Sequence, residues 1–252
     1  GILLFISPLL LIFSHLPDIL ENRESERITA DRAITLAEAS DLVSKADFLS
    51  TNEKEMIHAI NRVRTDPASY LAVVLPAFDE IKRDSTRLSR SVSEVVSTEW
   101  IYEDSGVRKR TDTTYRNHYN ELSKAYRSLI SDLINTDPMA PLLPHADLYK
   151  AASSHATDQI TTNYIQHWGT DGSWPQDRIE KSAPWSTRGN ENIAAGPGGV
   201  ESILLQLLVD SGVDVYVHRK NIRDPGFTHV ATYQVLELSY SRVSWWIQEF
   251  AN

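Results

Sequence analysis

Four polar residues in the last third of the chain have the side chains of a metal site or an acid–base site: His167, Glu191, Asp210 and His218. A neutral imidazole supplies a nitrogen ligand and a carboxylate supplies a charged oxygen, which is a donor set that zinc and similar divalent cations accept. The same groups could also act as an acid and a base. Their separations along the chain fit no single helix or hairpin, so a fold has to bring them together.

The composition is that of an acidic globular protein. The chain has 252 residues and a formal net charge of −9, and its 25 Lys and Arg residues are scattered. Nucleic-acid binding requires a basic surface that neutralises phosphates, so no nucleic-acid partner is expected. Cysteine is absent, which excludes disulfides, thiolate ligands and a cysteine nucleophile.

The chain opens with a mostly apolar run from Ile2 to Phe13, followed by a charged stretch. A membrane span needs roughly 18 or more apolar residues, so this run suits the core of an export signal better. Because Gly1 is not preceded by Met or a basic leader, we expect the true start to lie upstream. Residues 1–17 are therefore assigned to an export signal or anchor remnant, and a secreted or extracytoplasmic location is expected. Whether the segment is cleaved stays open; uncleaved, it would be the only contact with a membrane. The alternative is a short buried helix.

The rest of the chain divides into three parts by composition. Residues 18–50 are charged and rich in Ala and Ser, and are expected to form a linker or a loosely docked helix. Residues 51–252 carry the periodic apolar pattern of one domain. Within it, the charged stretch at about 79–120 is expected to be an inserted arm, helical in part, with a turn at Gly106.

The periodicity predicts helices first and strands last. Apolar residues recur at helical spacing in 51–66, 119–134, 145–162 and 200–209. Thr51 or Asn52 is the expected N-cap of the first of these helices. Two β-branched and aromatic runs, 227–238 and 243–250, predict antiparallel strands. The Gly- and Trp-rich loop 168–190 is expected to hold little regular structure. This order predicts an α+β or a layered α-β-α domain.

Several short motifs follow one another in a recognisable order: Ile60–Pro67, Leu142–His155, His167–Ser173, Arg178–Ile179, Asn190–Ala194, Leu207–Asp210, His218–Ile222, Asp224–Thr228 and Trp246–Ala251. In this order they resemble the CAP superfamily, or SCP domain, of sperm-coating, antigen-5 and pathogenesis-related proteins, in its cysteine-free bacterial-type branch. The resemblance runs from about residue 54 to the C-terminus and is interrupted by the arm. It implies a three-layer α-β-α sandwich with a mainly antiparallel central sheet.

The resemblance also implies a cleft lined by two histidines and two acids. Its first His matches His167, the acid of its Glu-Asn motif matches Glu191, and its second His matches His218. Its second acid, usually Glu in eukaryotic members, falls at Asp210. Ala231-Thr232-Tyr233 departs from the family's usual Gly-Val-Gly.

Three functions follow from these assignments. The first is an exported binding or interaction module for a lipid, glycan or protein, with zinc or another divalent cation held by His167 and His218 and supported by Glu191 and Asp210. The second is a metal-dependent hydrolase with Glu191 as base and Asp210 as the orienting group, although no nucleophile motif such as Gly-x-Ser-x-Gly occurs. The third is a structural extracytoplasmic domain in which the four residues form a hydrogen-bonded network.

Aromatic residues crowd the loop that follows His167. Trp168, Trp174 and Trp185 could stack on a sugar or an apolar ligand, although most tryptophans fill core space. His155, on the apolar face of its helix, is expected to be a buried histidine bonded to a neighbour and not a ligand.

Overall fold

The computed structural model describes residues 34–103, 106–162, 165–236 and 243–252. Its helices are α3 (Leu36–Lys45), α4 (Thr51–Thr65), α5 (Leu71–Arg83), α6 (Ser85–Arg90), α7 (His118–Asn135), α8 (Ala146–Thr162), α9 (Pro175–Ser182), α10 (Val200–Val209) and α11 (Val217–Ile222), with 3-10 turns η1 (Ala68–Tyr70) and η2 (Asp214–Tyr216). Its strands are β1 (Val92–Glu103), β2 (Gly106–Asn117), β3 (Leu143–Pro144), β4 (Gly189–Pro197), β5 (His229–Leu236) and β6 (Val243–Ala251). The expected export segment at 1–17 lies outside the described residues. Within them, no helix combines the length and the apolar character needed to cross a membrane.

The central sheet has the strand order β3-β5-β6-β4. β6 pairs antiparallel with both β5 and β4, whereas the short β3 runs parallel to β5, so the sheet is mixed and mainly antiparallel. The strands predicted in 227–238 and 243–250 are confirmed as β5 and β6. β4 was not predicted, because its sequence, Gly-Asn-Glu-Asn-Ile-Ala-Ala-Gly-Pro, is rich in residues that disfavour strands.

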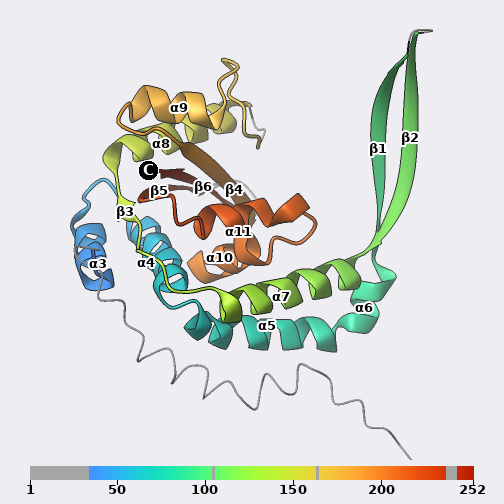
Figure 1. Ribbon diagram of the computed structural model, residues 1–252, viewed down its shortest axis with the longest axis horizontal. Coiled ribbons are helices and arrows are strands. Elements are labelled where there is room, and N and C mark those ends of the chain that lie inside the picture. Colours follow the sequence, from blue (N-terminus) through green and yellow to red (C-terminus); the bar gives the residue numbers. More distant parts are fainter. Residues whose placement is uncertain (1–33, 104–105, 163–164, 237–242) are drawn as a thin grey trace, which may run out of the picture.

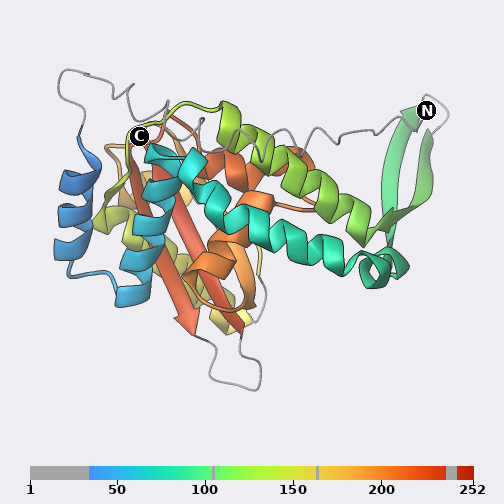
Figure 2. The ribbon, with the colours of Figure 1, turned by 90° about the horizontal axis from the view of Figure 1, so that it is seen from below.

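Helices cover both faces of this sheet (Figures 1 and 2). Alternation along β6 places Trp246 and Phe250 in the large core that they share with α4, α5, α7 and α10. Ile247 and Ala251 point the other way, into smaller apolar clusters with α8 and α9. The predicted three-layer α-β-α sandwich is therefore confirmed.

The first helix of the sandwich begins one residue earlier than the sequence suggested. Ser50, and not Thr51 or Asn52, is the N-cap of α4: its hydroxyl accepts from the amide of Glu53, whose carboxylate accepts from the amide of Ser50 at 2.7 Å. This reciprocal capping box satisfies two amides that would otherwise lack partners. The helix ends at Thr65, before Pro67, as predicted.

Residues 36–45 form α3, a helix that begins with a second capping box and packs against α4. Ala39 and Val43 are fully buried there. Helix α3 thus contributes to the same body as the residues that follow it.

The charged arm is mostly a β-hairpin and is helical at its two ends, in α5 and α6 before the hairpin and in the first residues of α7 after it. β1 and β2 pair antiparallel from Val92↔Asn117 to Glu103↔Gly106, and the hairpin stands away from the body beside α6 and α7 (Figure 1). Val is frequent in β1 and Thr is frequent in β2, and β-branched residues favour extended backbone. The turn expected at Gly106 would include residues 104–105, and these two residues lie outside the described ranges.

The loop 168–190 contains one helix, α9, so the expectation of little regular structure was wrong for Pro175–Ser182. Proline at the first helical position has a preset φ and lacks only an amide that the helix does not use. Asp177 accepts from the amide of Trp174 and fixes the start of the helix.

Candidate functional site

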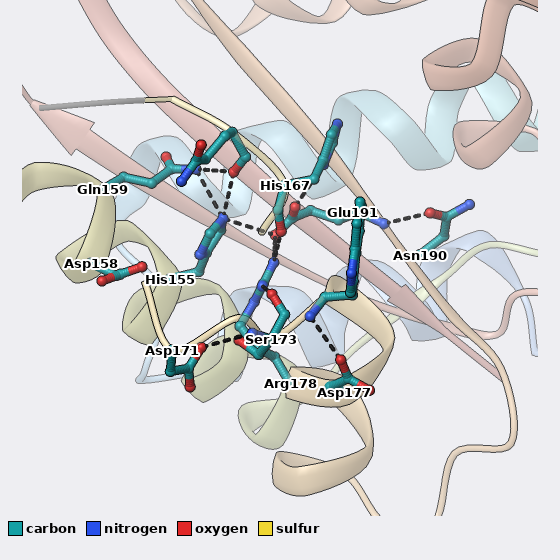
Figure 3. Close-up of polar contacts among 12 residues, drawn as sticks. His155, Asp158, Gln159, His167, Asp171, Ser173, Asp177, Arg178, Asn190 and Glu191 are labelled. Atoms are coloured by element: carbon teal, nitrogen blue, oxygen red, sulfur yellow. Dashed lines mark hydrogen bonds and ion pairs between the residues drawn. The ribbon is translucent and has the colours of Figure 1, made fainter. Parts of the chain in front are cut away.

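Glu191 is a buried carboxylate on β4 that holds one of the two predicted histidines (Figure 3). Its Oε1 accepts from His167 Nδ1 at 2.8 Å, and its Oε2 accepts from Arg178 Nη2 at 2.8 Å. Arg178, from α9, also donates to the main-chain oxygen of His167 at 2.9 Å. The carboxylate, the guanidinium and the loop therefore fix one another.

This arrangement also sets the tautomer of His167. A carboxylate that is paired with Arg178 can only accept, so Nδ1 carries the proton and the Nε2 of the neutral ring has a free lone pair. A carboxylate on Nδ1 is the usual support of a histidine that binds a metal through Nε2. The imidazole is partly exposed while Glu191 is buried, so the ring lies at the surface of the site.

A second carboxyl group, Glu249, lies beside Glu191. The two residues are directly opposite each other in the β4–β6 pair, and Glu249 is fully buried. Burial raises the pKa of Glu249 well above its usual range, and the charge of Glu191 raises it further. Two adjacent buried carboxyls cannot both ionise at little cost. Glu191 has the cationic partner, so Glu249 is the neutral member of the pair.

Neither Glu249 nor the role of Arg178 was predicted from the sequence. The available signal was a charged residue in the middle of β6, at the inward-facing position between Ile247 and Ala251. The partner of such a residue lies on another strand, and spacing along the sequence does not reveal it.

His155 is buried on α8, as predicted, and it borders the same site. Its Nε2 lies 2.8 Å from the main-chain oxygen of Gln166 and 2.9 Å from Gln159 Nε2, and 3.9 Å from the Oε2 of Glu191. Burial lowers its pKa, which favours the neutral ring. Its Nδ1 has no hydrogen-bond partner among the described residues.

The second histidine, His218, is held in the same way by Asp210. Asp210 Oδ1 lies 2.7 Å from His218 Nδ1, and Oδ2 accepts from the amide of His218 at 2.9 Å. Asp210 is the C-cap of α10 and has a left-handed backbone, φ 55° and ψ 40°. Asp tolerates this conformation better than most residues, and here it turns the carboxylate toward the first turn of α11.

Strand β4, at the edge of the sheet, contacts both His–acid pairs. Glu191 and Asn192 are consecutive, so their side chains point to opposite faces of the strand. Glu191 contacts His167, whereas Asn192 donates to the main-chain oxygen of His218 at 3.1 Å. Asn221, on α11, donates to Asn192 Oδ1 at 2.8 Å and thereby fixes α11 against β4.

A cavity of about 400 Å³ adjoins the second pair. Its wall is mainly apolar, with Leu122 and Tyr126 from α7, and Leu205 from α10 among the lining residues, and Asp210 and His218 at its polar end. An apolar wall with a few fixed polar groups is typical of small-ligand sites.

The donor chemistry of these pairs fits a divalent cation held by imidazole nitrogen. In each pair a carboxylate already occupies Nδ1, so the acids are supports and the Nε2 atoms are the available ligands. Within the described ranges, no three His, Cys, Asp or Glu side chains are grouped so that they could hold a metal ion. The cation therefore stays a prediction that rests on the two rings.

Comparisons of the sequence with known proteins gave a family match and a relative. The model of the CAP family, the cysteine-rich secretory protein family, matches residues 58–250. The protein YkwD of Bacillus subtilis, itself described as uncharacterised, is 28% identical over 130 residues, which are 50% of this chain. The match covers 47% of YkwD, so the chain spans about half the length of that relative.

Two solved structures are similar at lower identity. An outer surface protein of Borrelia burgdorferi is 16% identical with a TM-score of 0.39, over 52% of this chain and 92% of that one. An extracellular SCP-domain protein of Bacillus anthracis is 18% identical with a TM-score of 0.37, over 58% of this chain and 51% of that one.

Proposed function

Because the chain belongs to the CAP family of cysteine-rich secretory proteins, we propose that it is an extracytoplasmic binding module whose two His–acid pairs hold a divalent cation. The observation that carries the proposal is the carboxylate on Nδ1 of each ring, at 2.8 Å for His167 and 2.7 Å for His218. Both rings are thereby oriented with Nε2 as the free nitrogen. Zinc is the first candidate, since it accepts imidazole ligands and open coordination positions.

The hydrolase alternative is less well supported by the contacts of Glu191. A general base has to reach the proton that it removes and needs a free oxygen for it. Both oxygens of Glu191 are engaged, by His167 and Arg178, and the side chain is buried. Binding therefore suits this carboxylate better than proton abstraction does.

The proposed partner of the module is an extracellular lipid, glycan or protein, as expected from the sequence. The cavity beside His218 offers an apolar wall to the apolar part of such a ligand. The extracytoplasmic location rests on the family and on the apolar segment at the start of the chain.

Zinc titration of the metal-stripped full chain tests the cation proposal. We expect one zinc ion to bind the wild type, and we expect the His167→Ala/His218→Ala double variant to lose that heat of binding. The matched control is His145→Ala/His229→Ala, because it also removes two imidazoles, whose ring centroids lie 5.4 Å apart, outside the two His–acid pairs. The control variant should bind zinc like the wild type.

Three outcomes contradict the proposal: no zinc binding by the wild type, unchanged binding by the His167/His218 variant, or loss of binding in the control. Thermal unfolding of the same variants distinguishes zinc binding from the alternative in which the four residues form only a structural network. If the four residues only hold the fold together, the His167/His218 variant loses stability and the wild type gains none from zinc.

A further inference from the structure

Two exposed tryptophans stand side by side at the ends of the loop that follows His167. Trp168 is 47% exposed and Trp174 is 58% exposed, and their ring centroids are 6.0 Å apart at 57°. Adjacent indoles that remain in water present an apolar surface for contact with a ligand. This pair lies on the α8–α9 side of the sheet, away from the cavity beside His218.

The loop between the tryptophans is held rigidly. The amide of Gly169 closes the base of this loop by donating to the main-chain oxygen of Ser173 at 2.8 Å. Thr170 ties the loop to α8, because its amide donates to Asp158 Oδ2 at 2.8 Å. A Cβ at Gly169 would lie 2.7 Å from Asp171 Oδ1 and 2.8 Å from Ser173 Oγ, so glycine allows these oxygens to gather there. The two indoles are thus presented on a preorganised frame.

Beside this frame lies a polar pocket of about 310 Å³. The charged and hydroxyl groups on its wall are Asp158, Asp171, Ser173, Asp177, Arg178 and Lys181. His155 also lines the pocket, and its buried Nδ1 has no partner among the described residues. Hydrogen bonds from Thr170 lower the pKa of Asp158, and those from Ser173 lower the pKa of Asp171, so both carboxylates are ionised acceptors.

We propose that Trp168, Trp174 and this pocket form a binding site for a neutral saccharide. The C–H face of a sugar ring is apolar and packs on an indole, whereas its hydroxyls need fixed acceptors and donors beside it. An ionised carboxylate offers about four lone-pair positions, so each Asp can accept from hydroxyls in addition to its bonds within the loop.

The charges of the pocket exclude an acidic sugar or a phosphate as the preferred ligand. The pocket wall carries the carboxylates of Asp158, Asp171 and Asp177. Its two cations are Arg178 and Lys181, and Arg178 is already paired with Glu191 at 2.8 Å. Lys181 is then the remaining positive charge against three negative ones. A ligand without charge avoids repulsion from this excess.

The test is binding of cellohexaose, maltohexaose and chitohexaose to the full chain, with heparin and phosphatidylglycerol vesicles as charged and lipid probes. We expect the wild type to bind at least one neutral oligosaccharide, and Trp168→Ala/Trp174→Ala to bind it on the order of tenfold more weakly. The matched control is Trp185→Ala, which removes another surface tryptophan, 38% exposed, outside this pair. It should bind like the wild type.

A second measurement uses only the wild type, so it does not depend on whether a variant folds. The indole N–H resonances of Trp168 and Trp174 in the wild type should shift on addition of the bound oligosaccharide, and that of Trp185 should not. The proposal is overturned if no neutral oligosaccharide binds, if the shifts fall elsewhere, or if only heparin or the vesicles bind. The pocket shares Arg178 with the His167 site, and zinc binding distinguishes the two proposals. A tryptophan variant that binds zinc like the wild type and loses the saccharide supports the saccharide site.

Discussion

Glu249 is a carboxyl group at the centre of the sheet, fully buried and facing Glu191 across the β4–β6 pair. Its raised pKa makes the folded state hold a proton that the unfolded chain releases near its ordinary pKa of 4.5. The folded state therefore binds more protons than the unfolded state above that pH. By linkage, this carboxyl makes the free energy of unfolding fall as the pH rises from about 4.5 toward the folded-state pKa.

Glu249→Gln removes this dependence and keeps a donor that can face Glu191. Below pH 4.5 the variant and the wild type should have similar free energies of unfolding. Above pH 4.5, the free energy of unfolding of the variant should exceed that of the wild type. This difference should grow by about 1.4 kcal/mol per pH unit until the folded-state pKa of Glu249 is reached. Urea unfolding from pH 4 to pH 8 measures the difference, and subtracting the two curves cancels the other titrating groups. A difference that does not change with pH would show that Glu249 is ionised in the folded protein.

At the scale of elements, Arg64 joins α4 to the loops that lead into β3 and β5. It is fully buried and donates to the main-chain oxygens of Ala140, Ile222, Asp224 and Phe227 at 2.8–3.3 Å. Burial lowers its pKa to about 10, so it stays charged at neutral pH. These bonds fix the end of α11, the helix that carries His218.

Arg64→Met should lower the free energy of unfolding by at least about 3 kcal/mol, because it leaves several buried carbonyls without a donor. Arg62→Met is the matched control on the same helix. Arg62 pairs with Glu201 at 2.8 Å on the surface, and such a pair contributes under about 1 kcal/mol. Denaturant unfolding of both variants provides the comparison, and equal losses would contradict this account.

The hairpin of β1 and β2 is an element that the rest of the fold should not need. Its base is closed by the Val92↔Asn117 pair, and the amide of His118 donates to the oxygen of Ser91 at 3.1 Å. Replacing residues 93–116 by Asn-Gly keeps this base and supplies a two-residue turn. Asn117, which caps α7, is retained.

We expect this deletion to change the free energy of unfolding by about 1 kcal/mol or less, since it leaves the central core untouched. Thermal unfolding monitored by circular dichroism measures the change. A chain that no longer unfolds cooperatively after the deletion would show that the arm contributes to the core.

For the whole molecule, the sequence predicted the layers well because each layer has its own pattern. Apolar positions at helical spacing marked α4, α7, α8 and α10, and β-branched and aromatic runs marked β5 and β6. The order of the motifs then indicated the family, which the match over residues 58–250 shows. The four residues His167, Glu191, Asp210 and His218 were named in advance, whereas their pairing as His167–Glu191 and His218–Asp210 is known only from the structure.

The features that escaped prediction depend on contacts between distant segments. β4 is extended because it pairs with β6, despite a sequence that disfavours strands. Glu249 lies inside the sheet as a neutral carboxyl because burial and the charge of Glu191 both raise its pKa. Neither fact is visible in a local window of sequence.

The position of β6 has a consequence for how the chain reaches this state. β6 is the last of the described strands in sequence, yet it lies between β5 and β4 in the sheet. Neither neighbour can complete its backbone pairing until synthesis has passed residue 251, and the β4–β6 pair joins segments that are distant in sequence, which slows its formation. The described sheet of a growing chain would therefore stay incomplete, with β4 and β5 unpaired along the edges that face β6, until β6 has been made.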